Sequence, residues 1–295
     1  MSRSTTTASG GVASGRKVKL LDQIRIALRV RHYSRRTEEA YVRWIRRFVI
    51  FHSKRHPAEL GEQEVAQFLS DLAEARGVSA STQTQAASAL IFLYKKVLRR
   101  DIGWVEGIAR AKAPRRLPVV LTREEVKAIP EHLHGTKWLV AMLLYGSGLR
   151  LTECLQLRVK DLDFGRGEIR LRRGKGARDR VTMLPSSLKG PLSIHLEVVQ
   201  KRHIQDLACG AGYVKLPDAL ERKYPSASRE WAWQYVFPAS RLWKDSERDR
   251  RYRHHLHESA VQRAVKEAVR RAGITKRRLP CRPCARSTVV LHCLT

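Results

Sequence analysis

The chain has 295 residues, enough for about two domains and a sizeable buried core. Lys and Arg number 58 against 28 Asp and Glu, a formal net charge of +30, and hydrophobic residues make up 43% of the chain. That hydrophobic content excludes a chain that is disordered throughout. A folded protein of this charge repels itself, so a polyanion is the expected partner, with nucleic acid favoured over an anionic membrane surface.

The sequence also argues against a membrane or secreted protein. The longest strongly apolar stretch, residues 138–145, is far shorter than the roughly 20 residues that a membrane-spanning helix needs. Residues 1–16 contain no apolar signal segment and are predicted to form a disordered tail. An odd number of cysteines without a secretory signal indicates reduced thiols and a cytoplasmic location. The cysteines are Cys154, Cys209, Cys281, Cys284 and Cys293.

Apolar residues at helical spacing predict a compact four-helix domain over residues 17–100. The first predicted helix spans 17–31, and the second lies between the break at 34–37 and Pro57. The third spans 62–75, and the fourth runs from 79 to about 98. Basic residues gather at the end of the fourth helix and in the predicted linker, residues 101–117, where they are expected to contact a phosphate backbone. These residues are Lys95, Lys96, Arg99, Arg100, Arg110, Lys112, Arg115 and Arg116.

A second domain is predicted over residues 118–295. It opens with Thr122 and Glu125, which form a capping box at a helix start. The elements expected after it are helices at 138–145 and from 149, strands at 161–164, 168–171 and 180–184, a helix to about 209, an irregular stretch at 224–243, and a helix at 259–272. The predicted fold is therefore mainly α with a small antiparallel three-stranded β-sheet.

The first candidate site is residues 145–153 (YGSGLRLTE). Glycines before a helix start allow close approach of the backbone to a ligand, and Arg150 adds a permanently charged, bidentate donor suited to phosphate. A solvated arginine after a helix break would have the same sequence, so this fragment alone leaves both interpretations open.

The second candidate site is residues 172–180 (RRGKGARDR), between the second and third predicted strands. A lysine at a hairpin tip, here Lys175, can enter a groove and protonate a leaving oxygen. A plain basic turn is the alternative. The stretch is not a nucleotide-binding phosphate loop, because Ile169 stands where the first glycine is required and Gly176 replaces Ser or Thr.

Together these two motifs, about 25 residues apart, resemble the tyrosine recombinase family, and the resemblance extends over most of the chain. It implies an N-terminal SAM-like core-binding domain over 17–100 and an α+β catalytic domain over 118–295. Residues 219–225 (ALERKYP), 231–238 (WAWQYVFP) and 254–257 (HHLH) look like the additional segment of integron integrases, which would place an insert at about 210–257.

The resemblance implies DNA strand exchange through a phosphotyrosyl intermediate, without metal or other cofactor. Arg150 matches the first catalytic arginine, Lys175 matches the lysine that protonates the 5′-oxygen, and Glu153 would orient Arg150. The implied partners are a duplex attachment site, folded single-strand cassette hairpins and further copies of the chain in a tetrameric synapse. The residues expected at unpaired hairpin bases are Trp231, Trp233, Pro238, His254 and His255.

The C-terminal segment departs from the family pattern. Residues 281–284 (CRPC) occupy the position of the expected His-x-x-Arg box, and no tyrosine follows Tyr252. We therefore expect an incomplete catalytic domain, truncated or frameshifted after about residue 280. Half a zinc site formed by Cys281, Cys284 and His292 is a weaker alternative because a second ligand pair is missing. A metal site at 254–257 is likewise less favoured than DNA contact.

Several functions are compatible with these observations. The chain is interpreted as an integron integrase by descent that binds DNA and lacks catalysis. A catalytically dead DNA-binding remnant, or a recombinase of the phage or chromosomal type, is the alternative. A basic membrane-surface or RNA-binding helical protein would explain the charge but neither the two motifs nor the aromatic segment.

Overall fold

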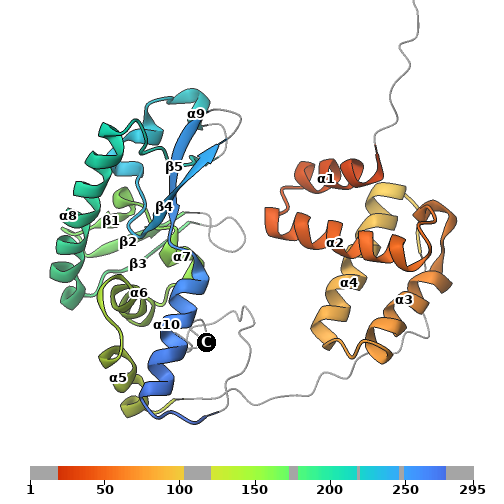
Figure 1. Ribbon diagram of the computed structural model, residues 1–295, viewed down its shortest axis with the longest axis horizontal. Coiled ribbons are helices and arrows are strands. Elements are labelled where there is room, and N and C mark those ends of the chain that lie inside the picture. The colour runs from red at the N-terminus through yellow and green to blue at the C-terminus, as the bar shows by residue number, and fades with distance from the viewer. Residues whose placement is uncertain (1–18, 103–120, 173–178, 218–219, 246–248, 277–295) are drawn as a thin grey trace, which may run out of the picture. The chain divides into compact units, whose positions relative to one another are not determined.

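The computed structural model describes residues 19–102, 121–172, 179–217, 220–245 and 249–276, and the chain divides into two compact units between Arg116 and Leu117 (Figure 1). In the described residues no helix is both long and apolar enough to cross a membrane. The predicted tail, residues 103–117 of the predicted linker and the 281–284 segment lie outside the described residues, as do Lys175, Arg110, Lys112, Arg115, Arg116 and His292.

The described part of the first unit, residues 19–102, forms four α-helices, as the apolar spacing predicts. They are α1 (Leu20–Val30), α2 (Arg35–Phe51), α3 (Glu62–Glu74) and α4 (Ala80–Phe92). Their apolar faces share one core, in which Ile24, Phe48 and Leu72 are fully buried.

Two boundaries in this unit differ from the prediction. Residues 34–37, predicted as a break between the first two helices, form the start of α2. Ser34 is its N-cap, and the Ser34 hydroxyl accepts a hydrogen bond from the Thr37 N–H. The fourth α-helix ends at Phe92, and a π-helical segment, Leu93–Leu98, continues it. The wider turn leaves Leu93 and Tyr94 buried and Lys95 and Lys96 exposed.

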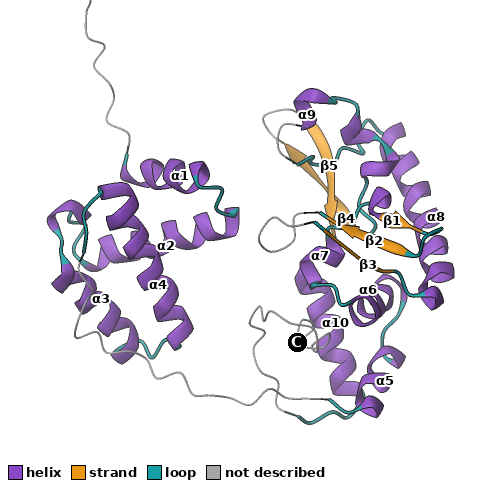
Figure 2. Cartoon of the chain, turned by 180° about the vertical axis from the view of Figure 1, so that it is seen from behind, coloured by secondary structure: helices purple, strands orange, loops and turns teal. Residues whose placement is uncertain are grey.

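The second unit combines helices with two small antiparallel sheets (Figure 2). Its helices are α5 (Arg123–Glu131), α6 (Gly135–Ser147), α7 (Leu151–Leu155), α8 (Ser186–Ala208), α9 (Leu220–Lys223) and α10 (Glu258–Arg271). Its strands are β1 (Leu162–Asp163), β2 (Glu168–Leu171), β3 (Arg180–Met183), β4 (Pro238–Asp245) and β5 (Arg250–His255). Helices α6, α7, α8 and α10 pack with the sheet β1–β2–β3 around one apolar core.

The sheet β1–β2–β3 and the capping box are confirmed. Strand β2 pairs with both neighbours in antiparallel register, and the Thr122 N–H donates to the Glu125 carboxylate at 2.7 Å. The prediction of an irregular stretch at 224–243 is wrong, because β4 begins at Pro238 and forms a hairpin with β5. Strand β5 (RRYRHH) has no apolar alternation, so its sequence lacks the usual strand signal.

Candidate active site and nucleic-acid interface

Arg150 lies at the junction between α6 and α7. Helix α6 ends at Ser147 and is followed by Gly148, whose φ of 61° is a left-handed conformation that glycine adopts easily, and Arg150 then caps the N-terminus of α7. Its backbone N–H donates to Glu153 Oε2 at 2.9 Å, and its guanidinium contacts Glu153 Oε1 at 2.5 Å. Glu153, which is expected to orient Arg150, therefore forms a direct ion pair with it.

Glu153 also joins Arg150 to the second candidate motif. Its Oε2 accepts a hydrogen bond at 2.7 Å from the guanidinium of Arg180, the first residue of β3. The Glu153 side chain is only 13% exposed, against 37% for Arg150 and 43% for Arg180. One shielded carboxylate therefore holds two arginines at the base of the β2–β3 hairpin whose loop carries Lys175.

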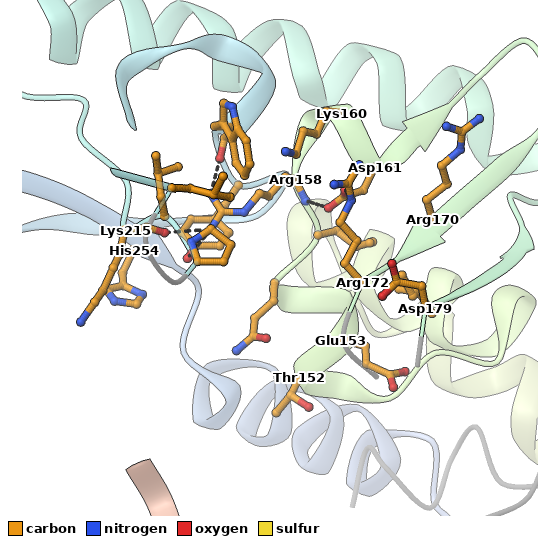
Figure 3. Close-up of a pocket in the computed structure, with 18 of the residues that line it drawn as sticks. Thr152, Glu153, Arg158, Lys160, Asp161, Arg170, Arg172, Asp179, Lys215 and His254 are labelled. Carbon is orange, nitrogen blue, oxygen red and sulfur yellow. Dashed lines mark hydrogen bonds and ion pairs between the residues drawn. The ribbon is translucent and has the colours of Figure 1, made fainter. Parts of the chain in front are cut away.

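Arg150, the end of β2 and Asp179, the residue before β3, border a pocket of about 740 Å³. Basic side chains outnumber acidic ones in its lining, and Figure 3 shows Arg158, Lys160 and Arg172 near its centre, with Arg170 and Lys215 at opposite sides. The basic lining residues are Arg150, Arg158, Lys160, Arg170, Arg172 and Lys215, and the acidic ones are Glu153, Asp161 and Asp179. The excess of fixed positive charge suits this pocket to a phosphodiester.

Arg158 forms the inner wall of the pocket, a role that no motif in the sequence indicates. It is 9% exposed and donates to the carbonyls of Trp233 at 2.6 Å and Lys215 at 2.8 Å. Its guanidinium carbon lies 5.4 Å from the centroid of the Trp233 ring and 4.7 Å from that of Tyr235. These contacts make Arg158 a structural cation that joins the turn after α7 to the aromatic segment before β4.

Burial changes the titration of two groups in the pocket wall. Burial lowers the pKa of Lys160 to about 8, assisted by Arg172, and the ammonium lies over the Trp233 ring. Burial also raises the pKa of Asp161, although the Arg158 N–H donates to its carboxylate at 3.0 Å. Lys160 is therefore a cation that loses its charge near neutral pH more readily than an ordinary lysine.

Of the predicted base-contacting residues, Trp233 and His254 line the pocket, and Pro238 and His255 lie next to His254 on the β4–β5 hairpin. The His254 and Tyr235 rings are stacked with an interplanar angle of 12° at 6.1 Å, and His255 meets Tyr235 edge-on at 5.3 Å. Pro238 lies opposite His255 in the β4–β5 register. Burial lowers the pKa of His254, assisted by the neighbouring His255, so its neutral form is favoured.

The two predicted tryptophans occupy different environments. Trp233 and His254 both line the pocket. Trp231 instead packs against His203 of α8, with ring centroids 5.9 Å apart. Both tryptophans are half-buried in one 3-10 turn, and the Trp233 ring already contacts the cations of Arg158 and Lys160.

The basic residues predicted at the end of the fourth helix are exposed, but two of them make contacts within the first unit. Lys95 Nζ lies 3.2 Å from Asp101 Oδ1, and the Arg100 guanidinium donates to the carbonyls of Ala58 and Leu60. Lys96 and Arg99 are exposed, and Arg99 ends the π-helical segment with a φ of 52°.

Comparison with known proteins agrees with this architecture. Residues 20–104 match the phage integrase N-terminal SAM-like domain, and residues 119–283 match the phage integrase family. Proteins called integrase/recombinase from Escherichia coli and Pseudomonas aeruginosa are each 50% identical over 274 residues, covering 93% of this chain and 81% of the relative. The tyrosine recombinase XerA of Thermococcus kodakarensis is 43% identical over 95 residues, 31% of this chain and 34% of the relative.

Solved structures share the fold. A lambda integrase tetramer bound to a Holliday junction matches with a TM-score of 0.53 and 15% identity, covering 87% of this chain and 63% of that chain. The recombinase XerH in a post-cleavage complex with its difH substrate matches with a TM-score of 0.52 and 16% identity, covering 88% and 69%. With a family match over 119–283 and relatives at 50% identity over most of their length, the chain belongs to the phage integrase family of tyrosine recombinases.

Proposed function

We propose that this chain is by descent a site-specific recombinase of the integron type, that it binds DNA in the cytoplasm, and that the pocket beside Arg150 receives the phosphate that is scissile in active members of the family. The observation that carries the proposal is the Arg150 guanidinium, held by Glu153 at the edge of a pocket with six basic side chains. Such fixed charge stabilises the extra negative charge of a pentacoordinate phosphorane without reorganisation. Lys175, in the adjoining hairpin, would protonate the 5′-oxygen.

The proposed organisation is a core-binding domain over residues 17–100, a linker over 101–117 and a catalytic domain over 118–295 with an insert at about 210–257. Basic residues of the first two segments would join the catalytic domain in forming a clamp around a duplex, and copies of the chain would associate on DNA. These residues are Lys95, Lys96, Arg99, Arg100, Arg115 and Arg116. The logarithm of the affinity should then fall with the logarithm of salt concentration, by roughly 0.9 per neutralised phosphate.

For a polypeptide of these 295 residues we propose DNA binding without cleavage. The family nucleophile is a tyrosine beyond the His-x-x-Arg box, whereas here Cys284 stands at the second arginine and no tyrosine follows Tyr252. Tyr235 lines the pocket, but Tyr235 and Tyr252 are each less than 10% exposed and pack against other aromatic rings, which leaves neither side chain free to move into line with a phosphate.

A suicide substrate, which traps covalent protein–DNA adducts, tests this proposal. We expect no adduct with the 295-residue polypeptide and an adduct when a family C-terminal segment follows Lys276. In that extended protein, Arg150→Lys should lower the rate by about 10²–10³-fold, the typical cost of one well-placed charge donor. An adduct with the 295-residue polypeptide would contradict binding without cleavage, and an extended protein unaffected by Arg150→Lys would contradict the phosphate site.

We further propose that the aromatic end of the pocket selects folded cassette hairpins by holding unpaired bases. The stacked Tyr235 and His254 rings, with Pro238 and His255 beside them, support this assignment. Replacing Trp231 or Trp233 with Ala should weaken binding to a bulged hairpin more than binding to a perfect duplex, because base stacking contributes about 1–3 kcal/mol.

Trp243→Ala is the matched control, because Trp243 is 55% exposed on β4 and is not among the proposed base contacts. Equal binding of hairpin and duplex by the unmodified protein would favour the phage or chromosomal type of recombinase instead.

A further inference from the structure

A buried ion pair joins the β4–β5 hairpin to α8. Arg253 on β5 is 9% exposed and Asp206 on α8 is 7% exposed. The guanidinium makes a two-pronged contact: Nη2 donates to Asp206 Oδ1 at 2.7 Å, and Nε donates to Oδ2. Two charges removed from water are stable only when each is fully paired, so the geometry of this contact is strongly restricted.

The same guanidinium stabilises an irregularity in β4. The register between β4 and β5 shifts between Pro238 and Leu242, and the strand there lacks regular ladder pairing. Arg253 Nη1 donates to the carbonyls of Ala239 at 2.7 Å and Ser240 at 3.1 Å, both within the shifted segment. Arg253 therefore supplies hydrogen bonds that the partner strand does not, in a segment where bulged strands typically redirect side chains.

This contact lies next to the proposed base-contacting residues. His254 and His255 follow Arg253 directly on β5, and Pro238 lies opposite His255 at the start of the shifted segment. Their positions along the two strands therefore depend on where the Arg253 guanidinium sits, and Asp206 determines that position from α8.

We propose that Arg253 and Asp206 are positioning residues that hold Pro238, His254 and His255 in the arrangement required to select hairpin DNA. The inference rests on the proposed recognition of folded cassette hairpins. Neither residue needs to touch DNA. Their contribution is to keep the β4–β5 hairpin in a single register. The Pro238, His254 and His255 side chains are then already ordered before DNA binds, so binding loses less conformational entropy.

The first test compares Asp206→Asn with Glu221→Gln. Glu221 of α9 pairs at 3.0 Å with Arg250, which lies on β5 like Arg253, but the two side chains are 23% and 38% exposed. The readout is the ratio of affinities for a bulged hairpin and a perfect duplex with identical arms. Asp206→Asn should lower this ratio by about tenfold, the value of one lost stacking contact, and leave duplex affinity within about twofold. Glu221→Gln should leave the ratio unchanged.

A double variant, Asp206→Leu with Arg253→Met, guards against simple unfolding, because apolar replacement of a whole buried pair is often tolerated. It should fold, bind duplex and still lose hairpin selectivity, with faster amide hydrogen exchange confined to β4 and β5. A double variant that keeps both its selectivity and its exchange pattern would overturn the inference. If the unmodified protein showed no preference for hairpin DNA, the proposed hairpin recognition would be wrong. If the preference persisted in the variants, the recognition would stand and only the positioning role of Arg253 and Asp206 would be wrong.

Discussion

The four-helix unit and the region around β4–β5 are stabilised by different kinds of contact. The four-helix core is almost entirely apolar, with Ile24, Leu28 and Phe48 fully buried. The second region depends on buried polar side chains that reach across long sequence separations. Those side chains are Arg158, His203, Asp206, Gln234 and Arg253.

This difference explains why the sequence predicts the elements of the first region but not the β4–β5 hairpin. An apolar core imposes a helical period on the residues that face it, so the period predicts the element. A core of charged and amide groups needs specific hydrogen bonds between particular partners, and no local repeat identifies those partners. The predictions below test the contrast from the largest expected effect to the smallest.

Phe48→Ala should cause the largest loss of stability. Phe48 is fully buried and meets the rings of Phe68 and Tyr94 edge-on, so truncation leaves a cavity that helices cannot close. We expect the free energy of unfolding of the first unit to fall by about 3–5 kcal/mol in chemical denaturation. Ile50→Ala on the same helix, at a side chain 58% exposed, should change it by less than about 0.5 kcal/mol.

Arg158→Met should destabilise the second unit by about 2–3 kcal/mol, because two charge-assisted hydrogen bonds to carbonyls disappear. The comparison variant is Arg170→Met. Arg170 is half-exposed, and its Nη2 lies 3.6 Å from Asp163 Oδ2, too far for a good hydrogen bond. Its expected cost is below about 0.5 kcal/mol. Similar denaturation midpoints for the two variants would mean that the polar contacts around Arg158 do not stabilise this region.

Ser34→Ala should cost about 1 kcal/mol in the first unit, because the Thr37 N–H loses its N-cap acceptor. Ser34→Asn should retain most of the stability, since its side-chain oxygen can also accept this bond. Thermal or denaturant unfolding of the three proteins would measure the difference, and equal losses for Ala and Asn would rule out capping as the cause.

The smallest effect concerns pH. Because the pKa of Lys160 is lowered to about 8, its charge is lost between pH 7 and 9. The salt dependence of duplex binding should then decrease by roughly 0.9 in slope over that range if Lys160 contacts a phosphate. Lys160→Arg, which stays charged, should keep a constant slope, and a constant slope in the unmodified protein would exclude the contact.

The lowered pKa of Lys160 also makes the free energy of unfolding depend on pH. Above about pH 8 the folded protein holds fewer protons at Lys160 than the unfolded chain, whose lysine titrates near 10.5. The free energy of unfolding should therefore gain a favourable contribution as pH rises from about 8 toward 10.5, and this contribution should be absent in Lys160→Arg.

The sequence by itself determined the elements whose signals are local. The spacing of apolar residues predicts α1 to α4, and Gly165 and Gly167 predict the turn between β1 and β2. Thr122 and Glu125 mark the start of α5. The contact between Arg150 and Glu153 was also predictable, because the two residues lie one helical turn apart.

Tertiary structure alone decided the rest. The sequence does not predict the hairpin β4–β5, because β5 lacks an alternation of apolar and polar residues. The side-chain contact that ties β5 to α8 joins two charges separated by 47 positions. Arg158 reaches the Trp233 carbonyl across 75 positions. Local patterns record which face of an element is apolar, whereas the partner of a buried charge depends on the folded path of the chain, which brings distant hydrogen-bonding groups within 3 Å.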